Sequence, residues 1–254
     1  MTPSLFDLPL RVGDAAALAG VILEQLRKPG APLNDDVRGR IAGRANGLKF
    51  QAMRPLMASL ERDPVHPSAY YVCVDGVDDQ PLLLRMAPAS TPSSGLFPKA
   101  ILIGRTYIGP SEAVLNAVPF GPGDNDRIRA FSEKVNPAFL PKPATTRPVI
   151  RVRAGGPGAA FPVAFEGFRK ILRTTGQNMA AFSLTDGQDA EAFYFTAVWS
   201  AIRTGWREGY ALEAPGTPVI DGVRGRPFET QLTFISRDVT LMPDMTRGQV
   251  LELF

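Results

Sequence analysis

The sequence predicts a protein of α/β or α+β class, with N-terminal helices and antiparallel hairpins followed by a parallel β-α-β-α-β segment. Two observations support this prediction. Between residues 147 and 214, short apolar runs alternate with amphipathic stretches of helix length. Between residues 69 and 118, four β-type runs follow one another without such helices. We expect three segments, 1–66, 67–145 and 146–254, within one compact domain.

Segment 1–66 reads as an extended arm followed by helices. The arm covers residues 1–13, and Asp14 is the expected cap of a first helix that ends before a Pro-Gly pair. A second helix is expected from Asn34 to about Gly43, and a third over residues 48–60.

Segment 67–145 reads as an antiparallel sheet. Two β-type runs flank an acidic, Gly-containing turn, and two more flank a Gly-Pro turn, so each pair predicts a hairpin. Cys73 lies in the first run among apolar neighbours, which indicates burial. Asp124 is the expected cap of a helix through Val135. The predicted strands are 69–74, 81–85, 100–103 and 113–118.

Segment 146–254 carries the clearest pattern. Strands are predicted at 148–153, 178–184 and 210–213, mutually parallel, because a helical stretch of about 16–20 residues separates each from the next. Gly176 is the expected end of the first of these helices, and Asp186 the expected cap of the second.

The C-terminal part combines one alternating run with an apolar end. Residues 229–235 alternate well enough to predict a strand. The last residues include Val250, Leu251, Leu253 and Phe254. We expect this tail to pack into the core or against another subunit, which favours a homo-oligomer.

The composition excludes several classes of partner and site. In 254 residues, 28 Lys and Arg stand against 25 Asp and Glu, and so small an excess argues against nucleic acid. One cysteine and one histidine allow neither an intramolecular disulfide nor a metal site built from those residues. No secretion signal or apolar run of about 18 residues occurs, so we expect a cytoplasmic protein without a membrane partner. The pattern identifies no cofactor.

The turn after strand 148–153 is the expected ligand-binding site. Ligands of open α/β sheets bind beyond the carboxyl ends of parallel strands. Arg151 and Arg153 alternate with apolar residues and therefore leave one face of their strand. Backbone N–H groups near Gly155, Gly156 and Gly158 precede a helix and favour an anion. A plain tight turn and an edge-exposed strand face are the alternatives.

Three carboxylates follow the other two strands. Asp186 and Glu213 are the candidate catalytic groups, and Asp189 is a candidate ligand-binding group. Carboxylates could also hold Mg²⁺, although the pattern predicts no metal site. For Asp186 and Asp189, helix capping is the alternative interpretation.

These features predict a small-molecule-binding protein that acts as an enzyme on an anionic, sugar-like or polyol metabolite through carboxylate and arginine chemistry. The alternative is a non-catalytic subunit of a homo- or hetero-oligomeric assembly, which the apolar tail and the scarcity of catalytic residue types favour.

Overall fold

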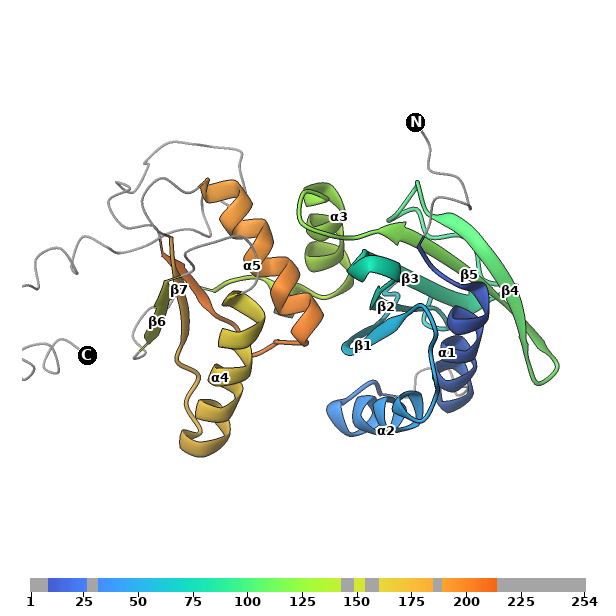
Figure 1. Cartoon of the computed structure of the whole chain (residues 1–254), viewed down its shortest axis with the longest axis horizontal. Coiled ribbons are helices and arrows are strands. Elements are labelled where there is room, and N and C mark those ends of the chain that lie inside the picture. The colour runs from blue at the N-terminus through green and yellow to red at the C-terminus, as the bar shows by residue number, and fades with distance from the viewer. Residues whose placement is uncertain (1–8, 27–31, 143–148, 154–159, 185–188, 214–254) are drawn as a thin grey trace, which may run out of the picture. The chain divides into compact units, whose positions relative to one another are not determined.

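The computed structural model describes residues 9–26, 32–142, 149–153, 160–184 and 189–213. The chain forms two compact units, Met1–Pro137 and Ala138–Phe254. The first is built on an antiparallel sheet and the second on a small parallel sheet, with helices in both (Figure 1). This mixed architecture confirms the predicted α/β or α+β class.

The sheet of the first unit has five antiparallel strands in the order β1-β2-β3-β5-β4. β2 pairs with β3 and β4 pairs with β5, which confirms both predicted hairpins. Residues on either side of position 66 contribute to the sheet. The strands are β1 (Arg54–Arg62), β2 (Tyr70–Asp75), β3 (Pro81–Pro88), β4 (Ile101–Ile108) and β5 (Ser111–Pro119).

The prediction of a third helix over residues 48–60 is wrong, because most of that stretch forms the edge strand β1. Leu, Met, Ala and Glu are good helix formers in isolation. Here the backbone pairs with β2 instead, starting with Arg54 opposite Asp75. The register shifts between Leu56 and Glu61, so the strand lacks the strict alternation by which a sequence reveals a strand.

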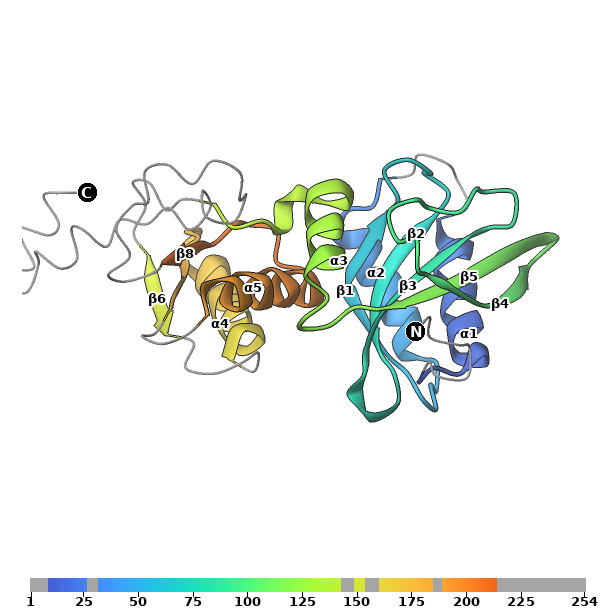
Figure 2. The same cartoon turned by 90° about the horizontal axis from the view of Figure 1, so that it is seen from above.

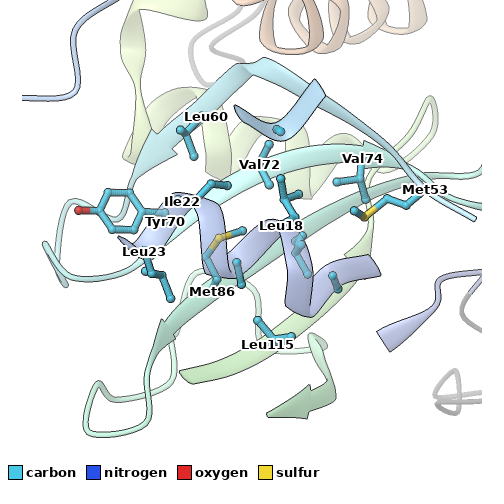
Figure 3. Packing of buried hydrophobic residues seen from close by; sticks show 14 of the residues in the cluster. Leu18, Ile22, Leu23, Met53, Leu60, Tyr70, Val72, Val74, Met86 and Leu115 are labelled. Atoms are coloured by element: carbon cyan, nitrogen blue, oxygen red, sulfur yellow. The ribbon is translucent and has the colours of Figure 1, made fainter. Parts of the chain in front are cut away.

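Two helices, α1 (Val12–Gln25) and α2 (Asp35–Asn46), cover one face of this sheet (Figure 1). Leu18 and Ile22 of α1 are fully buried and pack in one cluster with apolar side chains of the strands. Figure 3 shows this packing, with Val72, Met86 and Leu115 among the strand residues that it draws. The alternate residues of each strand therefore form the main core of the unit.

Asp14 does not cap α1 as predicted. The helix begins at Val12, and Asp14 lies in its first turn. Its Oδ2 accepts hydrogen bonds from the backbone N–H groups of Gln51 and Ala52, at 3.0 and 2.8 Å. Asp14 therefore ties α1 to the chain that enters β1. The prediction for α2 is confirmed, because the Asn34 side chain accepts from the N–H of Val37.

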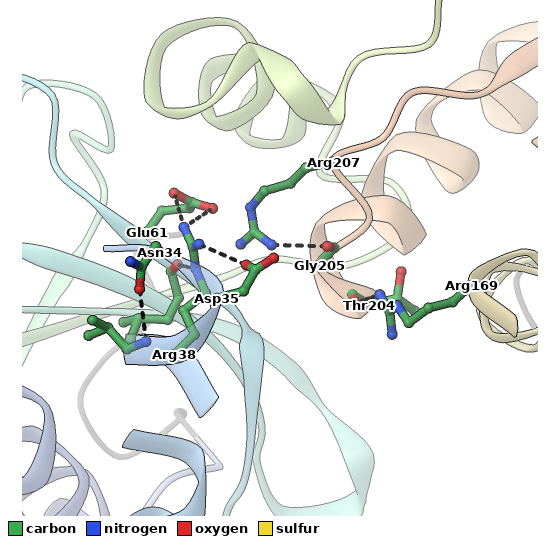
Figure 4. Close-up of polar contacts among 10 residues, drawn as sticks. Asn34, Asp35, Arg38, Glu61, Arg169, Thr204, Gly205 and Arg207 are labelled. Atoms are coloured by element: carbon green, nitrogen blue, oxygen red, sulfur yellow. Dashed lines mark hydrogen bonds and ion pairs between the residues drawn. The ribbon is translucent and has the colours of Figure 1, made fainter. Parts of the chain in front are cut away.

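Arg38 holds α2 against β1 (Figure 4). Its Nη2 donates to both carboxylate oxygens of Glu61 at 3.2 Å, and its Nε donates to the carbonyl oxygen of Leu60 at 3.0 Å. Both side chains of this ion pair are about nine-tenths buried. Because each charge has a partner of opposite sign, the pair can lie between helix and sheet.

The opposite face of the sheet carries the other set of alternate residues. Tyr71 contacts the rings of Phe97 and Phe131, with centroid separations of 5.4 and 6.1 Å. Cys73 is buried on the same strand, as predicted. This face is covered by α3 (Asn125–Ala130) and the π-helical turn η3 (Phe131–Val135).

The helix expected over residues 124–135 thus divides into α3 and η3. Asp124 occupies the N-cap position, but its carboxylate accepts from the N–H of Gly121 at 2.8 Å and caps no helical N–H. Two short 3-10 turns complete the described elements of this region, η2 (Val77–Asp79) and η4 (Pro137–Phe139).

The second unit contains the predicted parallel strands. β6 (Ile150–Arg153), β7 (Ala180–Ser183) and β8 (Ala211–Glu213) are mutually parallel in that order, which confirms the β-α-β-α-β prediction. The connecting helices are α4 (Ala160–Thr175) and α5 (Ala190–Thr204). Figures 1 and 2 show both helices on the same side of the sheet.

An aromatic cluster joins α4 to the central strand. Phe182 of β7 contacts Phe161, Phe165 and Phe168 of α4, with ring centroids 4.6, 5.0 and 5.6 Å apart. Offset aromatic contacts of this kind add to the free energy of apolar burial. Gly176 follows α4 with φ of 71°, which confirms the predicted helix end. The predicted strand 229–235 and the apolar tail lie outside the described residues.

Gly76 allows the N-terminal segment to lie close to the turn between β2 and β3. The N–H of Val77 donates to the carbonyl oxygen of Pro9 at 2.8 Å. A methyl group at Gly76 would collide with that oxygen. Gly76→Ala should therefore lower the free energy of unfolding by about 1–3 kcal/mol, measured by urea unfolding with far-UV circular dichroism.

The matched control is Gly39→Ala in the middle of α2, where no atom lies within 4 Å of the added methyl group. This change should raise the free energy of unfolding by roughly 0.5–1 kcal/mol, because alanine is the better helix former. Equal stability of Gly76→Ala and the wild type would contradict the contact with Pro9.

Tyr210 makes the second unit sensitive to alkali. Burial raises the pKa of its phenol well above the ordinary value. The hydroxyl donates to the carbonyl oxygen of Phe139 at 3.2 Å. In the unfolded chain the phenol loses its proton near pH 10, at about its ordinary pKa. The folded state keeps the proton, so this contribution to stability is complete below about pH 10 and declines above it.

Tyr210→Phe should lower the free energy of unfolding by about 0.5–1.5 kcal/mol at neutral pH, because one hydrogen bond is lost. The difference from the wild type should shrink above about pH 10, because the variant has no phenol to titrate at this position. Both tryptophans, Trp199 and Trp206, belong to the second unit, so their fluorescence during urea unfolding reports on it. A difference that stays constant from neutral to alkaline pH would refute this expectation.

Candidate functional site

The carboxyl ends of the three parallel strands lie in line. Arg153 of β6 pairs in register with Ser183 of β7, and Ser183 pairs with Glu213 of β8. We call these three residues the edge row. Each is the last residue of its strand, so the row marks the edge where the chain leaves the sheet.

Ser183, at the centre of the edge row, lies on the side of the sheet opposite to α4. Phe182 packs against α4, and strand residues alternate between the two sides, so position 183 belongs to the other side. Ala181 and Ala211 form the next row on that side and are fully buried, with Val149 packed against them.

The chemistry of the edge row changes from one end to the other. Arg153 is exposed, whereas Ser183 is only 6% exposed. Arg153 and Glu213 are two strands apart, which corresponds to about 9.6 Å between their backbones. The row thus has a cationic end, a central hydroxyl and an acidic end.

The other predicted site residues divide into two groups. Arg151 lies one row further from the edge than Arg153, in register with Ala181. Gly155, Gly156, Gly158 and Asp186 lie outside the described residues. The structure therefore places Arg151, Arg153 and Glu213 on one sheet and supplies no geometry for the glycine turn.

Asp189 caps α5. Its Oδ1 accepts hydrogen bonds from the N–H groups of Glu191 and Ala192, at 2.8 and 3.1 Å. This confirms the capping interpretation for Asp189, and it places the cap of the helix three residues after the cap predicted at Asp186. One oxygen of the Asp189 carboxylate is committed to the helix.

Ser183 was missed by the sequence analysis. It lies in a run that reads as a buried apolar strand, and its hydroxyl was not considered separately. Its position in the sequence could have identified it, because Ser183 is the only residue with a hydroxyl group in this run and stands at the carboxyl end of the strand. Among the residues that the structure describes, no three His, Cys, Asp or Glu side chains come close enough to hold a metal ion.

These features define a mixed α/β protein with a polar edge on a small parallel sheet. No protein-family model matches the chain, and no curated protein matches it. A solved structure with a similar arrangement is the glycerol complex of fructuronate-tagaturonate epimerase UxaE from Cohnella laeviribosi. The TM-score is 0.43 and the sequence identity 12% over 72% of this chain and 32% of the epimerase. The chain thus spans about a third of that enzyme, and at this similarity nothing about its activity is transferred.

One further observation concerns partners. No helix in the described part of the chain is long and apolar enough to cross a membrane. The expected homo-oligomer and the expected absence of a nucleic-acid partner stay predictions.

The cap at Asp189 gives a direct test of the role of this residue. Asp189→Ala should lower the free energy of unfolding by about 0.5–2 kcal/mol, because two N–H groups of α5 lose their acceptor. Asp189→Asn keeps an oxygen acceptor and should retain most of the stability. The measurement is urea unfolding followed by the fluorescence of Trp199, which lies in α5. If Asn proved as harmful as Ala, the charge rather than the cap would be the important property.

Proposed function

We propose that the chain binds a small anionic, sugar-like or polyol molecule at the edge row and acts on it as an enzyme. The observation that carries this proposal is the register that aligns Arg153, Ser183 and Glu213 at one edge of the parallel sheet. Ligands of open α/β sheets bind at this kind of edge, beyond the carboxyl ends of the strands.

The order of charges along the row favours a molecule with one anionic end. A guanidinium group binds carboxylates and phosphates through paired hydrogen bonds, so Arg153 suits the anionic group. A carboxylate repels a second anion but accepts hydrogen bonds from hydroxyl groups, and Ser183 offers a hydroxyl between the two. A chain of hydroxyl-bearing carbons that ends in a phosphate or carboxylate matches this sequence of groups.

The remaining predicted residues complete the proposal. Arg151 and the N–H groups of Gly155, Gly156 and Gly158 would strengthen anion binding next to Arg153. Glu213 and Asp186 would transfer protons to and from the hydroxyl-bearing carbons, and Asp189 would contribute a ligand contact. Carboxylates suit this role here because His66, the single histidine, belongs to the other unit.

The test is a titration of the full chain with inorganic phosphate, gluconate and glucose 6-phosphate at fixed ionic strength, followed by thermal unfolding. A ligand at about 100 times its Kd adds about 2.7 kcal/mol to the stability of the protein that binds it. Arg153→Ala should weaken binding by about 10- to 100-fold, because a charged hydrogen-bond donor is lost. Tryptophan fluorescence reports on the second unit, which contains the edge row.

Arg173→Ala is the matched control, because Arg173 is exposed in the last turn of α4 and away from the edge row. It should bind the three anions as the wild type does. Small, equal shifts in all three proteins would show only a general salt effect. That result would refute anion binding at the edge row and favour the alternative role as a non-catalytic subunit.

A further inference from the structure

The first unit contains a cavity of about 300 Å³ on the face of its sheet that turns away from α1 and α2. We call it the Arg85 cavity. Its floor is formed by residues of β2, β3 and β5, and its wall by the chain segment between β3 and β4. The floor residues are Tyr71, Leu83, Arg85, Asn116 and Val118.

The strand register sorts this floor into a polar row and an apolar row. Tyr71 pairs with Arg85, and Arg85 pairs with Asn116, so the three polar side chains are cross-strand neighbours. Leu83 and Val118 pair with each other in the adjacent row on the same face. A molecule in the cavity therefore meets hydrogen-bonding groups on one side and apolar groups on the other.

Buried contacts hold Arg85 in place. Its Nε lies 3.4 Å from Oδ2 of Asp63, and its Nη2 donates to the carbonyl oxygen of Pro92 at 2.9 Å. Arg85 is 6% exposed and Asp63 is completely buried. Nη1 of Arg85 donates a hydrogen bond to no acceptor among the described residues. Nη1 is not fully buried, so the cavity contains a fixed donor that a ligand can reach.

Both oxygens of the Asp63 carboxylate accept hydrogen bonds in this arrangement. Its Oδ2 also accepts the hydroxyl of Tyr71 at 2.9 Å, and its Oδ1 accepts the N–H groups of Val65 and His66. Asp63 therefore holds the Arg85 guanidinium in place before any ligand enters, which reduces the conformational entropy lost on binding.

Asn116 adds a second hydrogen-bonding group beside Arg85. Its side-chain amide makes no hydrogen bond to the described residues, although the residue is half-buried. The amide offers an NH2 group with two donor hydrogens and a carbonyl oxygen that accepts. Together with Nη1 of Arg85, it presents the complement of a group that both accepts and donates hydrogen bonds.

The charges favour a neutral ligand. Arg85 and Asp63 compensate each other, so an anion would add an uncompensated charge to an enclosed site. Burial raises the pKa of Tyr71 to about 12, and a hydrogen bond from Ser94 offsets only part of that rise. The phenol therefore stays neutral at physiological pH and donates to Asp63.

The wall of the cavity favours a flat apolar body. Phe97 is 5% exposed and meets the ring of Tyr71 edge to face, at an interplanar angle of 70°. Ala100 lines the same wall. An aromatic ring or short apolar chain would contact these groups together with Leu83 and Val118.

The geometry points to the Arg85 cavity as a binding site for a neutral small molecule that carries a primary amide or lactam group on an apolar ring. The carbonyl oxygen of the ligand accepts from Nη1 of Arg85, and its N–H donates to Oδ1 of Asn116. This site lies in a different unit from the edge row and differs from it in ligand charge, so the inference does not depend on the proposed function.

Benzamide and benzoate are the probes, because they share a ring and differ in the charge and donor of the head group. Binding to the full chain is measured by isothermal titration calorimetry and saturation-transfer NMR. We expect benzamide to bind at least about tenfold more tightly than benzoate, which is the effect of one hydrogen bond or of one uncompensated charge. Equal or tighter binding of benzoate, or no binding of benzamide at millimolar concentration, would overturn the proposal.

Two substitutions locate the probe without removing the buried charge pair. Asn116→Leu keeps the approximate volume and should weaken benzamide binding by about tenfold, whereas Asn46→Leu on the exposed end of α2 should leave it unchanged. Ala100→Phe fills the cavity and should abolish binding. Far-UV circular dichroism confirms that each variant is folded. Benzamide binding that survives Ala100→Phe in a folded variant would place the probe elsewhere and overturn the assignment.

Discussion

The pairing of β7 with a parallel strand on each side is the constraint on which the second unit depends. Because Ala180–Ser183 is central, its backbone groups are paired on both edges and all four of its residues are buried. Only apolar or small side chains fit these positions. Phe182 binds the sheet to α4, and Ala181 and Ser183 occupy the other side. The pairing that satisfies the backbone also aligns Arg153, Ser183 and Glu213.

In the first unit the strand β2 is also paired on both sides and buried, but the two faces of its sheet differ in chemistry. Successive residues of β2 alternate between the helical core, where Tyr70 and Val72 lie, and the opposite face, where Tyr71 lies. On that second face Asp63 compensates the buried charge of Arg85, and both of its carboxylate oxygens accept hydrogen bonds. The Arg85–Asp63 pair thus leaves the Arg85 cavity without net charge, whereas the edge row has a cationic residue at one end and an acidic residue at the other.

Turn residues and periodicity predicted the elements that depend on neighbouring residues. They failed where contacts with distant chain segments decide the structure. The hairpins and the parallel strands were found because turn residues and periodicity lie within a few positions of each other. The strand β1 was missed because its residues favour a helix until β2 is present. Asp14 and Asp124 were assigned as caps from type and position, yet their carboxylates bind N–H groups outside the helix, whose approach no local pattern encodes.

By itself, the sequence determined the α/β or α+β class, the two hairpins, the parallel arrangement of three strands and the place of Arg153 and Glu213 at strand ends. These follow from hydrophobic periodicity and turn chemistry, which act over short stretches of chain. Only the tertiary structure decided that Ser183 stands between those two residues, and that Asp63 fixes Arg85 beside Asn116. Strand register and burial bring together residues more than 20 positions apart, and neither quantity is encoded in any one segment.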